Sequence, residues 1–99
     1  MPLSRDEIKR LRGEAHSLAP VVRVGGGGLT DAVVRAMDDA LEAHELIKIR
    51  MLSDDREQRS AWIGEVLKRT RSEKVHAIGK TLTMWRKRQP KKAKEGRAH

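Results

Sequence analysis

The 99-residue chain contains no cysteine, phenylalanine or tyrosine, and its two aromatic residues are tryptophans. The lack of cysteine excludes disulfides, zinc–thiolate sites and cysteine nucleophiles, and it fits a reducing compartment. Only 37% of the residues are apolar and 2% are aromatic. We therefore expect one domain with a small, aliphatic core.

Long apolar segments are also missing. The first ten residues carry charges where a signal peptide needs an apolar stretch. No uninterrupted apolar stretch of the sequence is long enough to span a membrane. We therefore expect a cytoplasmic protein with no membrane partner.

Acidic residues are fewer than basic ones, 14 against 22, which gives a formal net charge of +8. Most of the excess lies in residues 86–99, whose net charge is +6, whereas the other 85 residues carry +2. Such a segment is typical of binding to polyanions, above all nucleic acid. We predict that residues 1–86 form the folded domain and that residues 87–99 form a basic, disordered tail. A tail that only aids solubility is the alternative.

The signatures of enzymes are absent or incomplete. Residues 79–81 (GKT) match the end of a phosphate-binding loop, but Lys74 stands where that motif requires its first glycine. The glycines at 25–28 begin a dinucleotide-binding pattern, which Thr30 interrupts at its last glycine. The four histidines lack metal-ligand spacing, and no nucleophile, base and orienting acid can be assembled. We therefore predict a non-enzyme without catalytic residues, metal, other cofactor or small-molecule substrate.

The periodicity of apolar residues predicts three helices and four strands. Candidate N-caps at Ser4 and Thr30 precede two helical segments, of which Pro20 is expected to end the first. A third helix is marked by apolar residues between 62 and 70. Alternating or β-branched runs predict strands at 21–24, 46–51, 74–78 and 81–86.

The order α-β-α-β-α-β-β predicts an α/β fold with one small mixed four-stranded sheet and packed helices. The strand–helix–strand unit implies a parallel pair, and the closing hairpin adds an antiparallel one. In strand 46–51 the apolar residues alternate with Lys48 and Arg50, which should emerge on the face away from the helices. We expect Trp62 in the core. We expect Trp85 to be buried or half-buried, rather than a stacking platform for a base.

Four consecutive glycines at 25–28 lie between a predicted strand and a predicted helix. Glycine leaves backbone N–H groups unshielded and tolerates positive φ. A helix that begins directly afterwards points its free N–H groups and the positive end of its dipole to the same place. The expected ligand is an anion, above all a nucleic-acid phosphate.

Four motifs follow in the order and spacing of CRM domains (chloroplast RNA splicing and ribosome maturation): LRGEAH at 11–16, VGGGGLT at 24–30, HELIKI at 44–49 and IGKTL at 78–82. Over about residues 3–86 the chain resembles this family, and in particular its stand-alone bacterial, YhbY-type members. The resemblance implies a fold similar to the C-terminal domain of bacterial translation initiation factor three, with one added N-terminal helix. It also implies a G-x-x-G loop similar to that of KH domains, which clamp single-stranded RNA through its backbone.

In this chain Gly25 and Gly28 are the framing glycines of that loop. Many family members place a basic or polar residue between them, whereas Gly26 and Gly27 stand here, so the loop offers N–H groups without a side-chain charge. The candidate RNA-binding residues are the loop, the cap that follows it and nearby basic side chains: Gly25, Gly26, Gly27, Gly28, Thr30, Arg23, Lys48, Arg50, Lys80, Arg86, Lys87 and Arg88.

Bacterial members of the family associate with precursors of the large ribosomal subunit. The resemblance thus implies a protein that binds large-subunit ribosomal RNA or pre-ribosomal particles and assists ribosome assembly, and we expect it to be monomeric. Three alternatives stay open. A protein-interaction module with incidental RNA contact would keep its partners after nuclease treatment, and an enzyme acting on RNA would show turnover. A binder of double-stranded DNA would need a helix with a basic reading face and a dimer.

Overall fold

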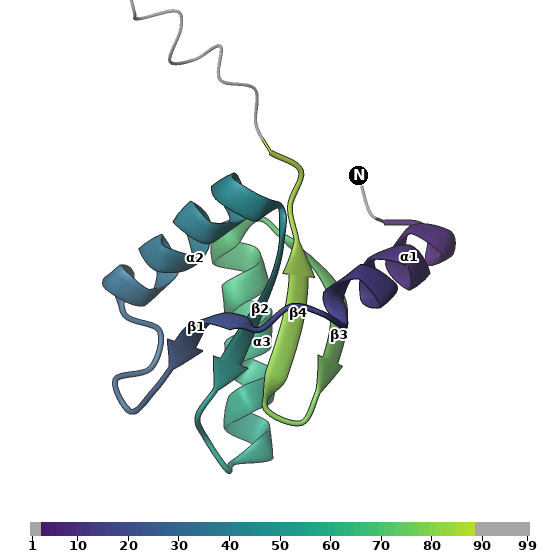
Figure 1. Ribbon diagram of the computed structural model, residues 1–99. Coiled ribbons are helices and arrows are strands. Elements are labelled where there is room, and N and C mark those ends of the chain that lie inside the picture. Colours follow the sequence, from purple (N-terminus) through teal and green to yellow (C-terminus); the bar gives the residue numbers. More distant parts are fainter. Residues whose placement is uncertain (1–2, 89–99) are drawn as a thin grey trace, which may run out of the picture.

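The computed structural model describes residues 3–88 and contains three helices and four strands in the predicted order (Figure 1). These elements are α1 (Arg5–Ala15), β1 (Pro20–Val24), α2 (Asp31–His44), β2 (Leu46–Met51), α3 (Arg56–Thr70), β3 (Glu73–Ile78) and β4 (Thr81–Trp85). The predicted α-β-α-β-α-β-β order is therefore confirmed. Most of the predicted tail, residues 89–99, lies outside the described residues.

Side-chain caps explain where the helices begin. Ser4 Oγ accepts a hydrogen bond from the Glu7 amide (3.1 Å), and the Glu7 carboxylate accepts one from the Ser4 amide (2.8 Å), which forms a capping box before α1. Thr30 Oγ1 accepts from the Val33 amide (3.1 Å) at the start of α2. Asp55 caps α3 by accepting from two amides of its first turn. The caps predicted at Ser4 and Thr30 are confirmed.

The helix α1 ends at Ala15, well before Pro20, which was expected to end it. The amide of His16 donates to the Gly13 carbonyl (3.2 Å) and the amide of Leu18 donates to the Ala15 carbonyl (3.0 Å), so the chain tightens into a turn. Gly13 favours this early end because glycine is a poor helix former. Ile8, Leu11, Ala15 and Leu18 recur at helical spacing in the sequence. Leu18 nevertheless lies in the turn, and Pro20 opens β1, a position that proline tolerates.

The four strands form one mixed sheet in the order β1-β2-β4-β3. β1 and β2 run parallel, whereas β2 with β4 and β4 with β3 are antiparallel. The predicted parallel pair and closing hairpin are both confirmed. Because β4 inserts between β2 and β3, residues from three strands lie in rows across the sheet, and one row joins Lys48, Thr83 and His76.

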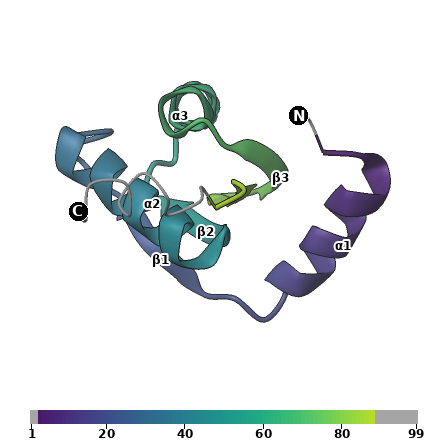
Figure 2. The same ribbon diagram turned by 90° about the horizontal axis from the view of Figure 1, so that it is seen from above.

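Helices cover the two faces of the sheet unequally (Figure 2). α2 and α3 pack on one face over the main core, which comprises Val22, Val24, Met37, Leu41, Ile47, Ile49, Met51, Val66, Leu82 and Met84. On the other face α1 covers a smaller cluster of Leu11, Ala15, Leu46 and Val75. The uncovered part of this second face, called the open face below, carries Arg23, Lys48, Arg50, His76, Thr81 and Thr83.

The two tryptophans differ in their surroundings. Trp85 is partly buried against the cluster under α1, as expected. Trp62 was expected in the core but is only partly buried and packs at its margin. Trp62 is not fully buried because its indole faces the glycine loop instead of the core. A Cβ added at Gly28 would lie 3.9 Å from Trp62 Nε1. Trp62 thus supports the loop from the side of α3.

The strand β3 contains a bulge that changes which face of the sheet its side chains lie on. Its pairing with β4 shifts between Lys74 and His76, so Val75 has no direct partner. Val75 is 5% exposed and packs under α1, whereas His76 lies opposite Thr83. The bulge therefore allows two consecutive residues of β3, Val75 and His76, to lie on the α1 side of the sheet.

Candidate nucleic-acid interface

Three connections meet at one end of the sheet, which we call the loop edge (Figure 1, bottom). They are the glycine loop after β1, the turn between β2 and α3, and the Gly79–Lys80 turn between β3 and β4. Backbone hydrogen bonds tie them together, since the Leu52 amide donates to the Val24 carbonyl (2.8 Å) and the Met51 amide donates to the Lys80 carbonyl (2.7 Å). The parallel β1–β2 pairing brings these distant segments to the same edge.

The glycine loop is a tight turn. The Gly28 amide donates to the Gly25 carbonyl (2.9 Å), and the Thr30 amide donates to the Gly28 carbonyl (3.0 Å). Of the four glycines, only Gly28 has a positive φ, +72°. The backbone conformation therefore demands glycine at Gly28 alone.

The other glycines leave the surface of the loop open. A Cβ added at Gly25 or Gly26 would meet nothing within 4 Å, and one at Gly27 would touch only a methyl group of Thr30 at 3.6 Å. Within residues 3–88, the amides of Gly26 and Gly27 donate to no backbone or side-chain acceptor. The loop thus presents two free N–H donors that no side chain shields.

Polar side chains at the start of α2 already have partners within the protein. Thr30 uses its hydroxyl as the helix cap, so this oxygen is committed to the Val33 amide. The Asp31 carboxylate bonds Arg69 Nη2 at 3.1 Å, and Arg69 Nη1 donates to the Leu29 carbonyl at 3.1 Å. Arg69 of α3 therefore braces the loop and places a cation beside it, a contribution that the sequence analysis missed.

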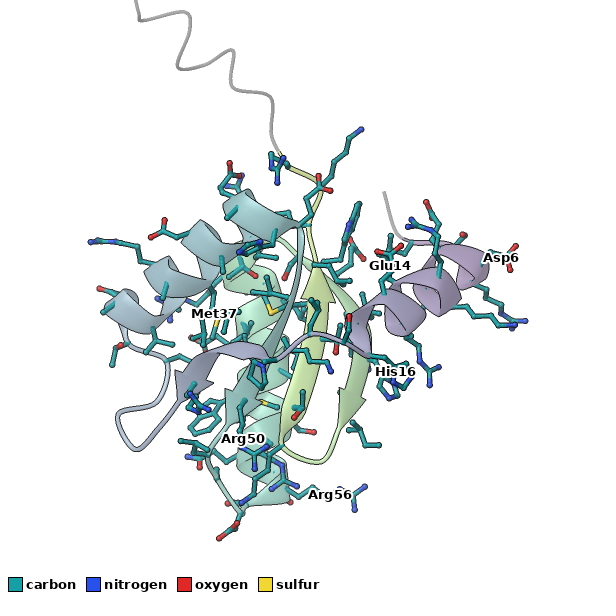
Figure 3. The ribbon with its side chains drawn as sticks, viewed as in Figure 1. Asp6, Glu14, His16, Met37, Arg50 and Arg56 are labelled. Atoms are coloured by element: carbon teal, nitrogen blue, oxygen red, sulfur yellow. The ribbon has the colours of Figure 1, made fainter. Side chains whose placement is uncertain are left out.

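Arg23, Lys48 and Arg50 lie on the open face. Arg23 of β1 is the direct neighbour of Arg50 of β2, and Arg50 pairs in turn with Thr81 of β4. Figure 3 shows the Arg50 side chain toward the loop edge. Within the described part of the chain, no carboxylate lies within ion-pair distance of these three cations. Like charges on adjacent strands repel one another, so an external anion would stabilise this arrangement.

Lys80 lies at the loop edge but has a partner. Its Nζ lies 2.6 Å from Asp54 Oδ1, and the Asp54 side chain is 94% exposed. The hydrogen bond and the positive charge of Lys80 hold the pKa of Asp54 below its ordinary value. An RNA phosphate would have to compete with this carboxylate for Lys80.

Arg86 differs from the other predicted RNA-binding residues because its side chain is bound within the protein. Its guanidinium is 16% exposed and bonds the Asp38 carboxylate (2.8 Å), the Thr70 carbonyl (2.7 Å) and the Glu42 carboxylate (3.4 Å). These contacts join α2, the end of α3 and the segment after β4. Arg86 was among the basic residues predicted to bind RNA, but its burial and partners indicate a structural role.

Arg88 is also held by the folded domain, although residues 87–99 were predicted to form the tail. Its guanidinium donates to the carbonyls of Glu42 (2.8 Å) and Ala43 (2.6 Å), and its amide donates to the Glu45 carboxylate (2.7 Å). The Arg88 side chain therefore caps the end of α2. Lys87 is exposed between the two arginines. These contacts with α2 reach two residues beyond the predicted boundary at residue 86.

The structure also brings together residues that were not among those predicted. Arg12 and His16 of α1 and His76 of β3 meet Lys48 beside the open face. In residues 3–88, no group of three or more metal-ligating side chains converges. No helix of this part is both long and apolar enough to cross a membrane.

Comparison with known proteins identifies a family. The CRS1/YhbY (CRM) domain matches residues 3–86. A Haemophilus influenzae protein named RNA-binding protein is 39% identical over 84 residues, which cover 85% of each chain. A Bacillus subtilis protein named probable RNA-binding protein YqeI is 35% identical over 84 residues, covering 85% of this chain and 88% of the relative. Neither name is that of an enzyme.

The fold leads to the same family. A solution structure of a Staphylococcus aureus protein superposes with a TM-score of 0.77 at 30% identity and covers 89% of this chain and 92% of that protein. The resemblance in the four sequence motifs is thereby confirmed over residues 3–86. With matching sequence, length and fold, this chain belongs to the CRS1/YhbY (CRM) domain family.

Proposed function

We propose that this protein binds single-stranded RNA with its glycine turn and its open face, and that it accompanies precursors of the large ribosomal subunit during assembly. It would act as a monomer in the cytoplasm. The observation that carries the proposal is the position of the Gly26 and Gly27 amides at the same edge as Arg23 and Arg50, since none of these groups has a partner within residues 3–88. The RNA-binding names of the relatives support it.

The binding mechanism follows from the donors available. The two free amides donate hydrogen bonds to the oxygens of one phosphate, which approaches closely because no side chain blocks the turn. Arg23 and Arg50 hold a neighbouring stretch of backbone. All these groups contact phosphate rather than base edges, so they position the RNA without reading its sequence. Selectivity would then come from RNA shape and from the ribosomal particle.

The glycine turn is tested by comparing two double variants. Gly26→Asp/Gly27→Asp places two carboxylates where the phosphate binds, and we expect at least a tenfold loss of affinity for a single-stranded RNA, since two opposed charges replace a favourable contact. Gly26→Asn/Gly27→Asn adds side chains of the same size without charge. We expect it to bind more tightly than the aspartate variant. Both variants should melt like the parent because the added atoms meet open space or an ordinary contact.

Unchanged affinity of the aspartate variant, measured by fluorescence anisotropy, would remove the glycine turn from the interface. The ribosomal part of the proposal is tested by gradient sedimentation of the tagged protein, with and without nuclease. Cosedimentation with large-subunit precursors that nuclease abolishes supports it. Association that survives nuclease would instead favour a protein-interaction module, and absence from all ribosomal particles would overturn the assembly role.

A further inference from the structure

A groove lies between the inner end of α1 and the open face, away from the glycine turn. It has a volume of about 330 Å³. α1 contributes Arg12 and its C-cap residue His16, β2 contributes Lys48, and β3 contributes His76. Figure 3 shows His16 at the end of α1 beside the sheet. The floor is formed by Thr81 and Thr83 of β4.

The floor of this groove contains an unpartnered hydroxyl. Thr83 is 3% exposed, yet within residues 3–88 its side chain makes no hydrogen bond. The other buried threonine, Thr70, donates to the Val66 carbonyl at 2.7 Å and contacts the Ser72 hydroxyl. The hydroxyl is not sealed off from solvent, because the only fully buried side-chain polar atom without a partner in residues 3–88 is Arg86 Nε. The Thr83 hydroxyl is therefore available to a ligand in the groove.

The ionisable groups around this hydroxyl are all basic. Lys48 and His76 flank Thr83 in the same row of the sheet, and Arg12 and His16 close the groove from α1. No carboxylate lines the groove in the described part of the chain. Burial, followed by the charges of Arg12, His16 and Lys74, lowers the pKa of His76 below its ordinary value. This crowding of cations would be relieved by an anion.

We propose that the groove is a second phosphate site for the same RNA strand, in which Thr83 and Lys48 bind one phosphodiester and His16 and His76 tighten the binding when they are protonated. The proposal rests on the RNA binding proposed above and adds residues and a pH dependence to it. The path is continuous, since Lys48 and Arg50 lie two residues, about 7 Å, apart on the same face of β2. Arg50 leads on to Arg23 and the glycine turn.

The pH dependence follows from linkage. A bound phosphate favours the protonated imidazoles, so affinity rises as the pH falls from about 8 to about 6. The charged groups that face His76 are Arg12 and His16 on α1, Lys48 on β2 and Lys74 on β3, while β4 offers only hydroxyls. Burial and the neighbouring cations disfavour the protonated form of His76 in the free protein, and a bound phosphate offsets this repulsion in the complex.

The test measures the affinity for an oligouridylate at about pH 8 and pH 6 and constant ionic strength. For the parent we expect roughly tenfold tighter binding at the lower pH, the effect of one charge-assisted hydrogen bond. His16→Gln/His76→Gln should bind almost equally at both pH values. His44→Gln, in the last turn of α2 and outside the lining of the groove, is the matched control and should keep the parent's dependence.

A second variant separates binding from folding. Thr83→Val replaces the hydroxyl by a methyl group of similar size, and because the hydroxyl has no partner, we expect the variant to melt at or above the temperature of the parent. Its affinity for the oligouridylate should nonetheless fall severalfold. Loss of a hydroxyl that binds the ligand lowers the affinity without lowering the stability. Loss of a packing contact would lower the stability as well.

The outcomes distinguish the two proposals. If Gly26→Asp/Gly27→Asp weakens binding but the double histidine variant keeps the full pH dependence, or Thr83→Val binds as the parent does, the groove proposal is overturned and the glycine turn stands. If no RNA binds at either pH, both fail. A pH-dependent shift of the His76 imidazole resonances by inorganic phosphate, without any effect of the oligouridylate, would show an anion site and also overturn the RNA site.

Discussion

At the residue scale, the glycines of the loop serve two different purposes. Gly28 has φ of +72°, a conformation that costs a residue with a Cβ roughly 1–2 kcal/mol. Gly26 has no positive φ and open space around it. One glycine is therefore required by the backbone conformation, whereas the conformation and packing at Gly26 would accept a side chain.

Substitution by alanine should separate these purposes. We expect Gly28→Ala to lower the free energy of unfolding by about 1 kcal/mol because alanine is strained at this φ. Gly26→Ala should leave stability unchanged or raise it slightly, since it reduces the freedom of the unfolded chain. Urea denaturation of both variants gives the comparison. Equal destabilisation by both would contradict the assignment.

Arg86 is a second position where one residue decides stability. Its guanidinium joins Asp38, Glu42 and the Thr70 carbonyl, and it is mostly buried. We expect Arg86→Gln to cost about 1–3 kcal/mol, because the charge-assisted bonds disappear and a partly buried carboxylate is left without its partner. Lys87→Gln, next along the chain and exposed, should cost almost nothing in the same thermal or urea unfolding. RNA binding that falls in Arg86→Gln without loss of stability would restore Arg86 to the interface.

At the scale of elements, the turn between β3 and β4 is tied to the connection before α3 by Lys80 and Asp54. The folded state lowers the pKa of Asp54 below its ordinary value of 3.8, chiefly through the hydrogen bond from Lys80. A carboxylate with a lowered pKa stabilises the fold above that ordinary value, and this contribution is lost as the pH falls through the folded-state pKa.

Lys80→Gln should therefore be slightly less stable than the parent at about pH 6, and the two should converge at about pH 2. The measurement is the free energy of unfolding in urea at both pH values. Lys9→Gln, at an exposed position without an ion pair in the described residues, should track the parent throughout. A difference between Lys80→Gln and the parent that persists at low pH would assign the effect to packing instead of the ion pair.

At the scale of the whole molecule, charge is divided between a nearly balanced domain and a basic C-terminal segment. Because Arg86 and Arg88 are bound by the domain, the cations to remove in a test of the tail lie beyond them, at Lys91, Lys92, Lys94 and Arg97. A truncation after Arg88 preserves the contacts with α2. A cut at residue 87 would disturb the end of that helix as well.

The truncated protein should show a flatter dependence of RNA affinity on salt. For single-stranded RNA, every phosphate that the protein no longer neutralises reduces the slope by roughly 0.7, so removal of all four cations would reduce it by up to about 3. Replacing the four residues by glutamine in the full chain provides the control for length. A slope that neither variant changes would exclude the tail from RNA binding.

Much of the fold was predictable because its signals are local. Ser4 and Thr30 are helix caps, apolar and basic residues alternate over 47–51, and Gly79–Lys80 is a turn between two strands. The predicted end of α1 was wrong because the apolar spacing continued to Leu18 while Gly13 and the local turn ended the helix earlier. The bulge at Val75 could not be predicted from the local sequence, since it depends on packing between β3 and α1.

The sequence by itself determined the element order, the mixed sheet, the bare glycine loop and the basic character of the protein, because caps, periodicity, glycine and charge are properties of neighbouring residues. Only the tertiary structure decided which cations are free. It commits Arg86 and Arg88 to α2 and Lys80 to Asp54, while it leaves Arg23, Lys48 and Arg50 without a carboxylate in the described part of the chain. It also gathers Arg12, His16 and His76 around Thr83. These contacts join residues far apart in the chain, and sheet order and helix packing alone bring them together.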